Sequence, residues 1–169
     1  MRVTVARPSD GAGAAAADRT VTGEGGVRFA GLGASNARSV VYVVDASGSM
    51  VTSLPFVIAE VERSVSQLAA TQKFGVVLFR RLPDGRSGLE VFSPVLVRAT
   101  TSAQERLRDW LATVEPAGRS VPLIGLERAI AYRPDAVFLL SRAIGRSGGD
   151  AWDTGGGRGV SDTLAENAK

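Results

Sequence analysis

Residues 39–50 read SVVYVVDASGSM, and this stretch decides the fold. Its first seven residues are β-branched, aromatic and almost continuously apolar, which predicts a strand buried on both faces in the middle of a parallel sheet. The residues ASGSM then form a turn. A helix is expected over residues 52–70, because apolar residues recur there three and four positions apart and so share one face. This order of strand, turn and helix is the repeating unit of an α/β sheet.

The rest of the chain continues the alternation of strands and helices. Strands are expected over residues 27–32, 73–80, 89–97 and 136–141, and helices over residues 102–114, 122–132 and 160–168. Pro94 marks residues 89–97 as an edge strand, antiparallel to residues 73–80, because proline cannot donate to a β-ladder. The alternation implies a mostly parallel sheet with right-handed crossovers, and ligands of such sheets bind at the carboxyl ends of the strands.

The turn after the buried strand carries the most informative side chains. Asp45 ends the strand, and Ser47 and Ser49 follow at alternate positions, with a glycine between them that lets the loop fold back. One carboxylate and two hydroxyls at a helix N-terminus form a half-shell for Mg²⁺, which prefers a few protein oxygens plus water. The alternative is that the turn only caps the helix, with Ser49 accepting from backbone N–H groups. The predicted topology places residues 118–121 and 141–142 beside this turn.

The segment VVYVVDASGSM resembles the opening of the von Willebrand factor A (vWA) fold, whose Asp-x-Ser-x-Ser motif matches Asp45, Ser47 and Ser49. The resemblance covers about residues 29–140 and is nearest to bacterial forms. It implies a Rossmann-like α/β fold with helices on both faces of the sheet. It also implies a metal-ion-dependent adhesion site (MIDAS), in which Ser120 stands at the position of the family's metal-binding threonine.

The chain departs from the family at the end of the last predicted strand. Family members carry a Thr-Asp-Gly sequence there, whereas this chain has Arg142 at the position of the aspartate. The resemblance therefore implies a degenerate site with two outcomes. Either Mg²⁺ binds weakly and accepts an Asp or Glu side chain of a protein partner, or Arg142 pairs with Asp45 and replaces the cation. In the second case the domain is a metal-free scaffold that binds through the edge of its sheet.

The family fold also continues beyond the point where this sequence stops, so a C-terminally shortened vWA-like domain is expected over residues 27–144. Residues 1–26 are rich in Gly and Ala and are expected to form a disordered arm, and residues 145–169 a Gly-rich tail with a short helix. In that arrangement residues 136–140 lie along an open apolar edge, which invites pairing. Either another chain covers the edge, such as a second copy of this one, or the Gly-rich tail folds over it, or the shortened domain has limited stability.

Composition excludes several classes of function. The chain has no cysteine and no histidine, which removes thiol chemistry, a Ser-His-Asp triad and the commonest general base. We therefore expect a binding module and not an enzyme. The formal net charge is +3, but the arginines are scattered, so no nucleic-acid partner is expected. No apolar stretch reaches membrane-spanning length and no signal peptide is recognisable, which makes the cytoplasm the default location.

Overall fold

The computed structural model describes residues 2–6, 27–29, 32–34, 37–82 and 84–141. Its strands are β1 (Arg2–Ala6), β2 (Val27–Phe29), β3 (Leu32–Ala34), β4 (Ser39–Asp45), β5 (Lys73–Phe79), β6 (Glu90–Val91), β7 (Val97–Arg98) and β8 (Ala136–Leu140). Its helices are a 3-10 turn η1 (Gly48–Met50), α1 (Leu54–Ser66), α2 (Thr101–Leu111) and α3 (Pro122–Ala131). The predicted α/β alternation is confirmed.

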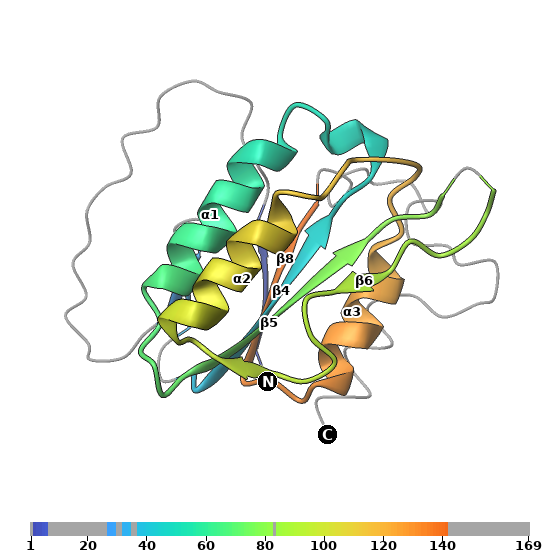
Figure 1. The fold of residues 1–169 in the computed structure, drawn as a ribbon. Helices are drawn as coiled ribbons and strands as arrows, with labels where there is room; N and C mark the ends of the chain where they lie inside the picture. Colours follow the sequence, from blue (N-terminus) through green and yellow to red (C-terminus); the bar gives the residue numbers. More distant parts are fainter. Residues whose placement is uncertain (1, 7–26, 30–31, 35–36, 83, 142–169) are drawn as a thin grey trace.

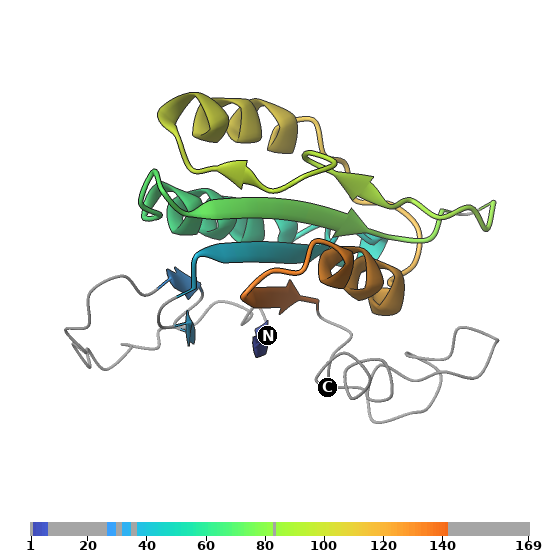
Figure 2. The ribbon, with the colours of Figure 1, turned by 90° about the horizontal axis from the view of Figure 1, so that it is seen from below.

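The main sheet has the order β1-β8-β4-β5-β6, and β7 pairs with β5 beside β6. Strands β1, β8, β4 and β5 are parallel, whereas β6 and β7 run antiparallel to β5. The succession of β5, β4 and β8 can be followed in Figure 2. Strand β4 therefore lies in the interior of the sheet, as its apolar sequence predicts.

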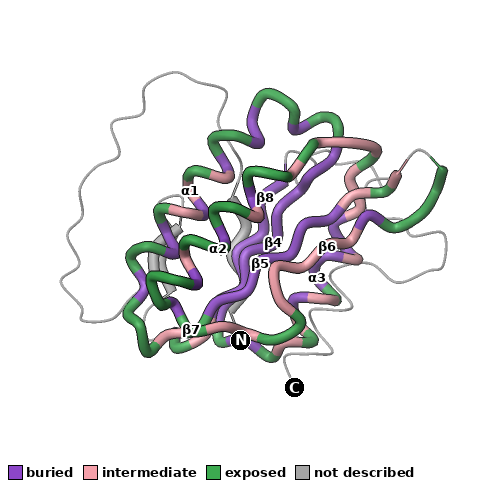
Figure 3. The backbone as a smooth tube through the Cα atoms, in the orientation of Figure 1, coloured by how far each residue is buried: buried purple, intermediate pink, exposed green. Residues whose placement is uncertain are grey.

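Helices cover both faces of this sheet (Figure 1). Alternate residues of β4 belong to different cores. Tyr42 packs with the buried side chains of α1 and α2, while Val41 packs with Leu126 and Ala129 of α3. The tube in Figure 3 is buried along β4, β5 and β8, and the outer faces of the helices are exposed. Because β4 is covered on both faces, every side chain from Val40 to Asp45 is buried.

Local sequence explains where the helices begin. Thr100 caps α2 by accepting a hydrogen bond from the backbone N–H of Ala103 at 3.3 Å. Pro122 occupies the first turn of α3, where a missing N–H has no cost. Helix α1 begins at Leu54, two residues later than predicted, and ends at Ser66, four residues earlier; a 3-10 turn over residues 48–50 precedes it.

The edges of the sheet differ from the sequence-based expectation. The predicted single strand over residues 89–97 is two short strands, β6 and β7, with the non-donating Pro94 between them. At the opposite side, β1 pairs in parallel with β8 along all five of its residues. The expectation of an open edge along residues 136–140 is therefore wrong, and so is the expectation that the whole of residues 1–26 is a disordered arm.

Of the remaining predictions for the two ends of the chain, the structure describes only the one over residues 27–32. The short strand expected over residues 27–32 is a two-stranded antiparallel pair, β2 and β3, separate from the main sheet. Residues 7–26, the Gly-rich tail over residues 145–169 and the helix expected over residues 160–168 lie outside the described residues.

Candidate functional site

Asp45 is the centre of a polar cluster at the carboxyl end of β4. Its side chain is fully buried, and both carboxylate oxygens accept hydrogen bonds. Oδ1 accepts from the backbone N–H of Ser47 at 2.9 Å. Oδ2 accepts from the hydroxyls of Ser120 and Ser141, each at 2.6 Å. Three segments that are far apart in the sequence therefore meet at a single carboxylate.

A second pair of hydroxyls extends this cluster to the surface. Ser47 Oγ and Ser49 Oγ lie 3.0 Å apart, and Ser47 is buried while Ser49 is exposed. Ser120 is half-buried, and its Oγ lies 3.4 Å from Ser141 Oγ. The cluster thus runs from the buried Asp45 to an exposed hydroxyl, so a ligand can reach it from solvent.

Backbone hydrogen bonds hold the three loops in this arrangement. The turn after β4 is tied to the loop before α3 twice, because Gly48 N–H donates to Gly118 O at 3.0 Å and Ala117 N–H donates to Ala46 O at 2.9 Å. Ala46 N–H also donates to Phe79 O at the end of β5, at 3.0 Å. The hydroxyls therefore sit on a backbone framework that is itself fully paired at these points.

Gly118 brings the Ser120 loop against the strand end of β5. Its φ is +67°, and a Cβ built there would lie 1.9 Å from the carbonyl oxygen of Arg81. This close approach allows Arg81 and Arg119 to exchange two backbone hydrogen bonds, at 2.7 and 2.8 Å. Only glycine combines the left-handed conformation with such a contact, so the position of Ser120 depends on Gly118.

The structure brings together the four residues that the sequence analysis named as metal ligands, Asp45, Ser47, Ser49 and Ser120. It also adds Ser141, which the sequence analysis placed near the crevice but did not assign to the site. The signal for Ser141 was its place directly after a buried strand parallel to β4. Arg142 lies outside the described residues.

The helix-capping alternative does not explain the cluster. Ser47 is the N-cap of η1 and Ser53 is the N-cap of α1, and neither makes a capping hydrogen bond with its side chain. Ser49, which this alternative names as the capping residue, has its hydroxyl 3.0 Å from Ser47 Oγ instead.

The donor set is rich in oxygen and poor in charge. It comprises one carboxylate and four hydroxyls, and oxygen ligands of this kind are those that hard cations such as Mg²⁺ prefer. Within the part of the chain that the structure describes, no three His, Cys, Asp or Glu side chains gather at one point. Among the described residues, only Asp45 would bring a negative charge to a divalent cation at this cluster.

Comparisons with known proteins bear on the fold. No family model matches the sequence, and no curated protein matches it. The chain is similar in structure to a von Willebrand factor type A protein from Catenulispora acidiphila, with a TM-score of 0.50 and 18% sequence identity. The similarity covers 64% of this chain and 26% of the other, so this chain spans about a quarter of its relative's length. This likeness confirms the predicted vWA-like, Rossmann-like fold.

Across the described residues, none of the helices combines the length and apolar character that a bilayer crossing requires.

Proposed function

We propose that this chain is a protein-interaction module that binds a carboxylate of its partner through a weak Mg²⁺ site. Asp45, Ser47, Ser49 and Ser120 would hold the cation. The convergence of these side chains at the carboxyl end of β4 carries the proposal, because two hydroxyls lie 2.6 Å from Asp45 Oδ2 and a second pair reaches the surface. Ligands of open α/β sheets bind at this end of the strands.

The chemistry of the hydroxyls is compatible with a bound cation. A serine hydroxyl has one proton and two acceptor lone pairs. Ser120 gives its proton to Asp45, so a lone pair of Ser120 Oγ remains to contact a metal ion. Ser49 is exposed and offers its oxygen in the same way from the surface side. Ser120 can therefore keep its hydrogen bond to Asp45 while a lone pair of its oxygen contacts a cation.

The low charge of the site determines what it would accept. Asp45 supplies one negative charge against the two positive charges of Mg²⁺, which leaves the bound ion able to attract a further anion. A partner's Asp or Glu supplies that charge and an oxygen ligand of the kind Mg²⁺ prefers. We infer a weak affinity for the cation alone and a stronger one when a partner carboxylate is present.

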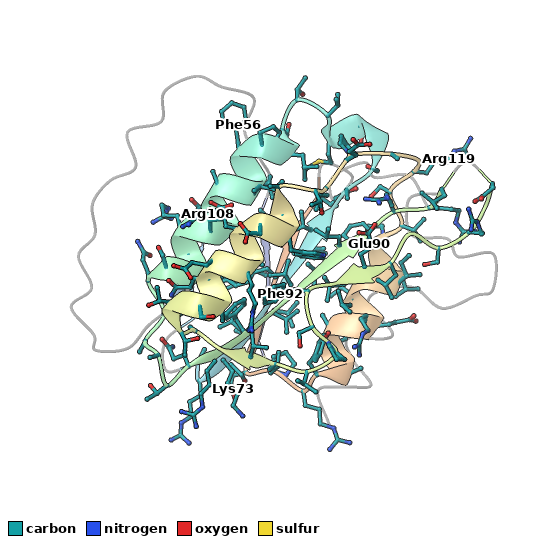
Figure 4. The ribbon with its side chains drawn as sticks, viewed as in Figure 1. Phe56, Lys73, Glu90, Phe92, Arg108 and Arg119 are labelled. Carbon is teal, nitrogen blue, oxygen red and sulfur yellow. The ribbon has the colours of Figure 1, made fainter. Side chains whose placement is uncertain are left out.

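The surface beside the cluster has the apolar character of an interaction site. Val51 and Phe56 are 61% and 77% exposed, and they follow Ser49 within the turn and the first turn of α1. Figure 4 shows Phe56 at the start of α1. Exposed aromatic side chains next to a polar centre favour a protein partner over a small solute.

A titration of Mg²⁺ followed by thermal unfolding tests the metal site. A cation that binds only the folded state raises stability by about 1.4 kcal/mol at ten times its dissociation constant. We expect the parent chain to respond, Asp45→Asn to lose the response, and Asp109→Asn, an exposed carboxylate on α2, to keep it. A parent chain whose unfolding temperature ignores Mg²⁺ would contradict the metal site.

A metal-free scaffold is the second candidate, and one observation favours it. Asp45 already accepts three hydrogen bonds from the chain, which stabilise its negative charge without a cation. Pairing of Arg142 with Asp45 would act in the same direction. The substitution Arg142→Asp separates the two candidates. If the variant responds to Mg²⁺ and the parent does not, the native site works without metal.

Neither candidate assigns catalysis to the cluster. The whole chain lacks histidine and cysteine, and the oxygens of Asp45 accept hydrogen bonds from fixed donors that would oppose its use as a nucleophile. We therefore propose binding and not turnover as the role of this site.

A further inference from the structure

We propose that Arg81 and Arg119 form a second anchor for the partner, a paired guanidinium site that binds carboxylates of an acidic peptide segment. The inference deepens the proposed function, because it names the chemistry of the partner. It does not require the cation, since the two arginines lie outside the hydroxyl cluster.

The backbone fixes the two arginines opposite each other. Arg81 N–H donates to Arg119 O at 2.7 Å, and Arg119 N–H donates to Arg81 O at 2.8 Å, which makes them a hydrogen-bonded pair of an antiparallel bridge. Side chains of such a pair leave the same face of the bridge, with their Cβ atoms about 5.5 Å apart. Two guanidinium groups therefore start from neighbouring points on one surface.

The pair is built into the fold by more than this bridge. Arg81 is also bridged to Ser87 on its other side, so it is the middle of three short extended segments. Gly118 packs against the Arg81 carbonyl oxygen and leaves no room for a Cβ. These contacts fix the backbone at both arginines, so binding of a ligand costs little main-chain conformational entropy.

Neither arginine has its charge compensated within the described residues. Both side chains are exposed, and the salt bridges of this part of the chain involve other arginines, Arg63, Arg80, Arg86 and Arg108. Like charges placed directly opposite each other across strands destabilise the pairing. An anion shared between the two guanidinium groups would remove this repulsion.

The position of the pair connects it to the candidate site. Arg119 directly precedes Ser120, whose hydroxyl contacts Asp45. Figure 4 places Arg119 at the same end of the molecule as the finish of β5. Within the described residues, the two arginines bring two positive charges to the end of the molecule that holds Asp45, which favours an anionic ligand there.

An acidic peptide fits this surface better than a nucleic acid. A guanidinium matches a carboxylate with two parallel hydrogen bonds, so two neighbouring arginines suit a segment with closely spaced Asp or Glu side chains. Nucleic-acid binding uses a stripe of basic residues along several phosphates. Here the adjacent turn contains Asp84, paired with Arg86, and Glu90 lies beside Arg80, which interrupts any such stripe.

The test measures binding of a fluorescently labelled poly-glutamate peptide by polarisation at low ionic strength, with a metal chelator present. We expect Arg81→Gln and Arg119→Gln each to weaken binding about tenfold, the loss typical of one charged hydrogen-bonding partner. The matched control is Arg98→Gln. Arg98 is exposed and sits opposite Lys73, a second like-charged pair at the other end of β5, where Figure 4 shows Lys73.

Three results would overturn the inference. They are a parent chain that does not bind the peptide, an Arg98→Gln variant that weakens binding as much as Arg119→Gln, and tighter arginine-dependent binding of a labelled oligothymidine than of poly-glutamate. The chelator keeps this test independent of the metal site. If Mg²⁺ leaves the unfolding temperature unchanged but the arginine dependence holds, the metal site fails and the paired anchor stands.

Discussion

Asp45 is a buried carboxylate whose hydration is replaced by groups of the protein. Burying an isolated charge is costly, and hydrogen bonds from a backbone N–H and two hydroxyls offset that cost. The same hydroxyls are the groups that we propose to contact a cation. A single residue thus serves both the stability of the loops and the chemistry of the proposed site, which links mutations in the site to the stability of the fold.

Replacing Gly118 tests two causes of destabilisation, the left-handed backbone conformation and the close contact with Arg81. Gly118 and Gly85 both have positive φ values, +67° and +82°, but only Gly118 has atoms within 4 Å of a built Cβ. We expect Gly85→Ala to cost about 1–2 kcal/mol, the penalty of a left-handed alanine. Gly118→Ala should cost clearly more, because the Arg81–Arg119 bridge must open, and it should displace Ser120.

Urea unfolding of both variants measures this difference. The Gly118→Ala variant should also lose any Mg²⁺ response and any poly-glutamate binding, while Gly85→Ala should keep both. Equal destabilisation by the two substitutions would show that the close approach of Gly118 to Arg81 does not constrain the loop.

At the scale of the elements, helix α3 lies unusually close to the sheet. A Cβ on Gly125 would lie 2.7 Å from Phe79 Cδ1 and 2.8 Å from Val43 Cγ1. In an exposed helix interior alanine is preferred to glycine by about 1 kcal/mol. At Gly125 we expect the opposite preference, with Gly125→Ala costing about 1–3 kcal/mol through overpacking.

The matched comparison is Ala59→Gly, at an exposed interior position of α1. Chemical unfolding should show that glycine destabilises α1 and alanine destabilises α3. If Gly125→Ala instead stabilises the protein, α3 can move away from the sheet at no cost, and the position of the Ser120 loop that precedes it is less fixed than the contacts indicate.

The elements that the sequence predicts best are those whose side chains are buried on a regular period. Strand β4 is found with the predicted limits, and β5, α2 and α3 differ from prediction by one to three residues at their ends. Strand β1 was missed because its five residues precede a long Gly/Ala-rich segment, and its partner β8 is more than a hundred residues away in the sequence. A local pattern does not reveal which edge such a strand will join.

The candidate site was predictable to a similar extent. The motif around Asp45 and its expected topology were sufficient to name four residues that do converge. Ser141 was not assigned, because its role depends on the parallel register of β4 and β8, in which Val44 lies opposite Leu140. That register places the residues after both strands side by side. The predicted topology anticipated this placement for residues 141–142, but it did not show that the Ser141 hydroxyl would reach Asp45.

At the scale of the whole molecule, two aspartates tie opposite ends of the central strands. Asp45 joins the loops at the carboxyl ends, while Asp135 joins the amino ends of β4 and β8. Asp135 Oδ2 accepts from the backbone N–H groups of Arg38 and Ser39, both at 2.8 Å, and from Ser39 Oγ at 2.9 Å. Ser39 Oγ in turn accepts from Asp135 N–H at 3.0 Å. The sheet is therefore anchored by carboxylates at both ends.

The Asp135 anchor predicts how stability changes in acid. Burial alone would raise the pKa of Asp135, but the hydrogen bonds from Ser39 and Arg38 outweigh it and lower the pKa below its ordinary value of 3.8. Such a group stabilises the folded state at pH values above 3.8, and its contribution is lost as the pH falls through the lowered pKa.

The unfolding temperature of the parent should therefore fall over this acidic range. The Asp135→Asn variant should have a lower unfolding temperature than the parent at neutral pH and should lose less of it in acid. Asp109→Asn is the control and should follow the parent. An Asp135→Asn variant with the parent's full acid dependence would assign the decline to other carboxylates and remove Asp135 as the anchor of the two strands.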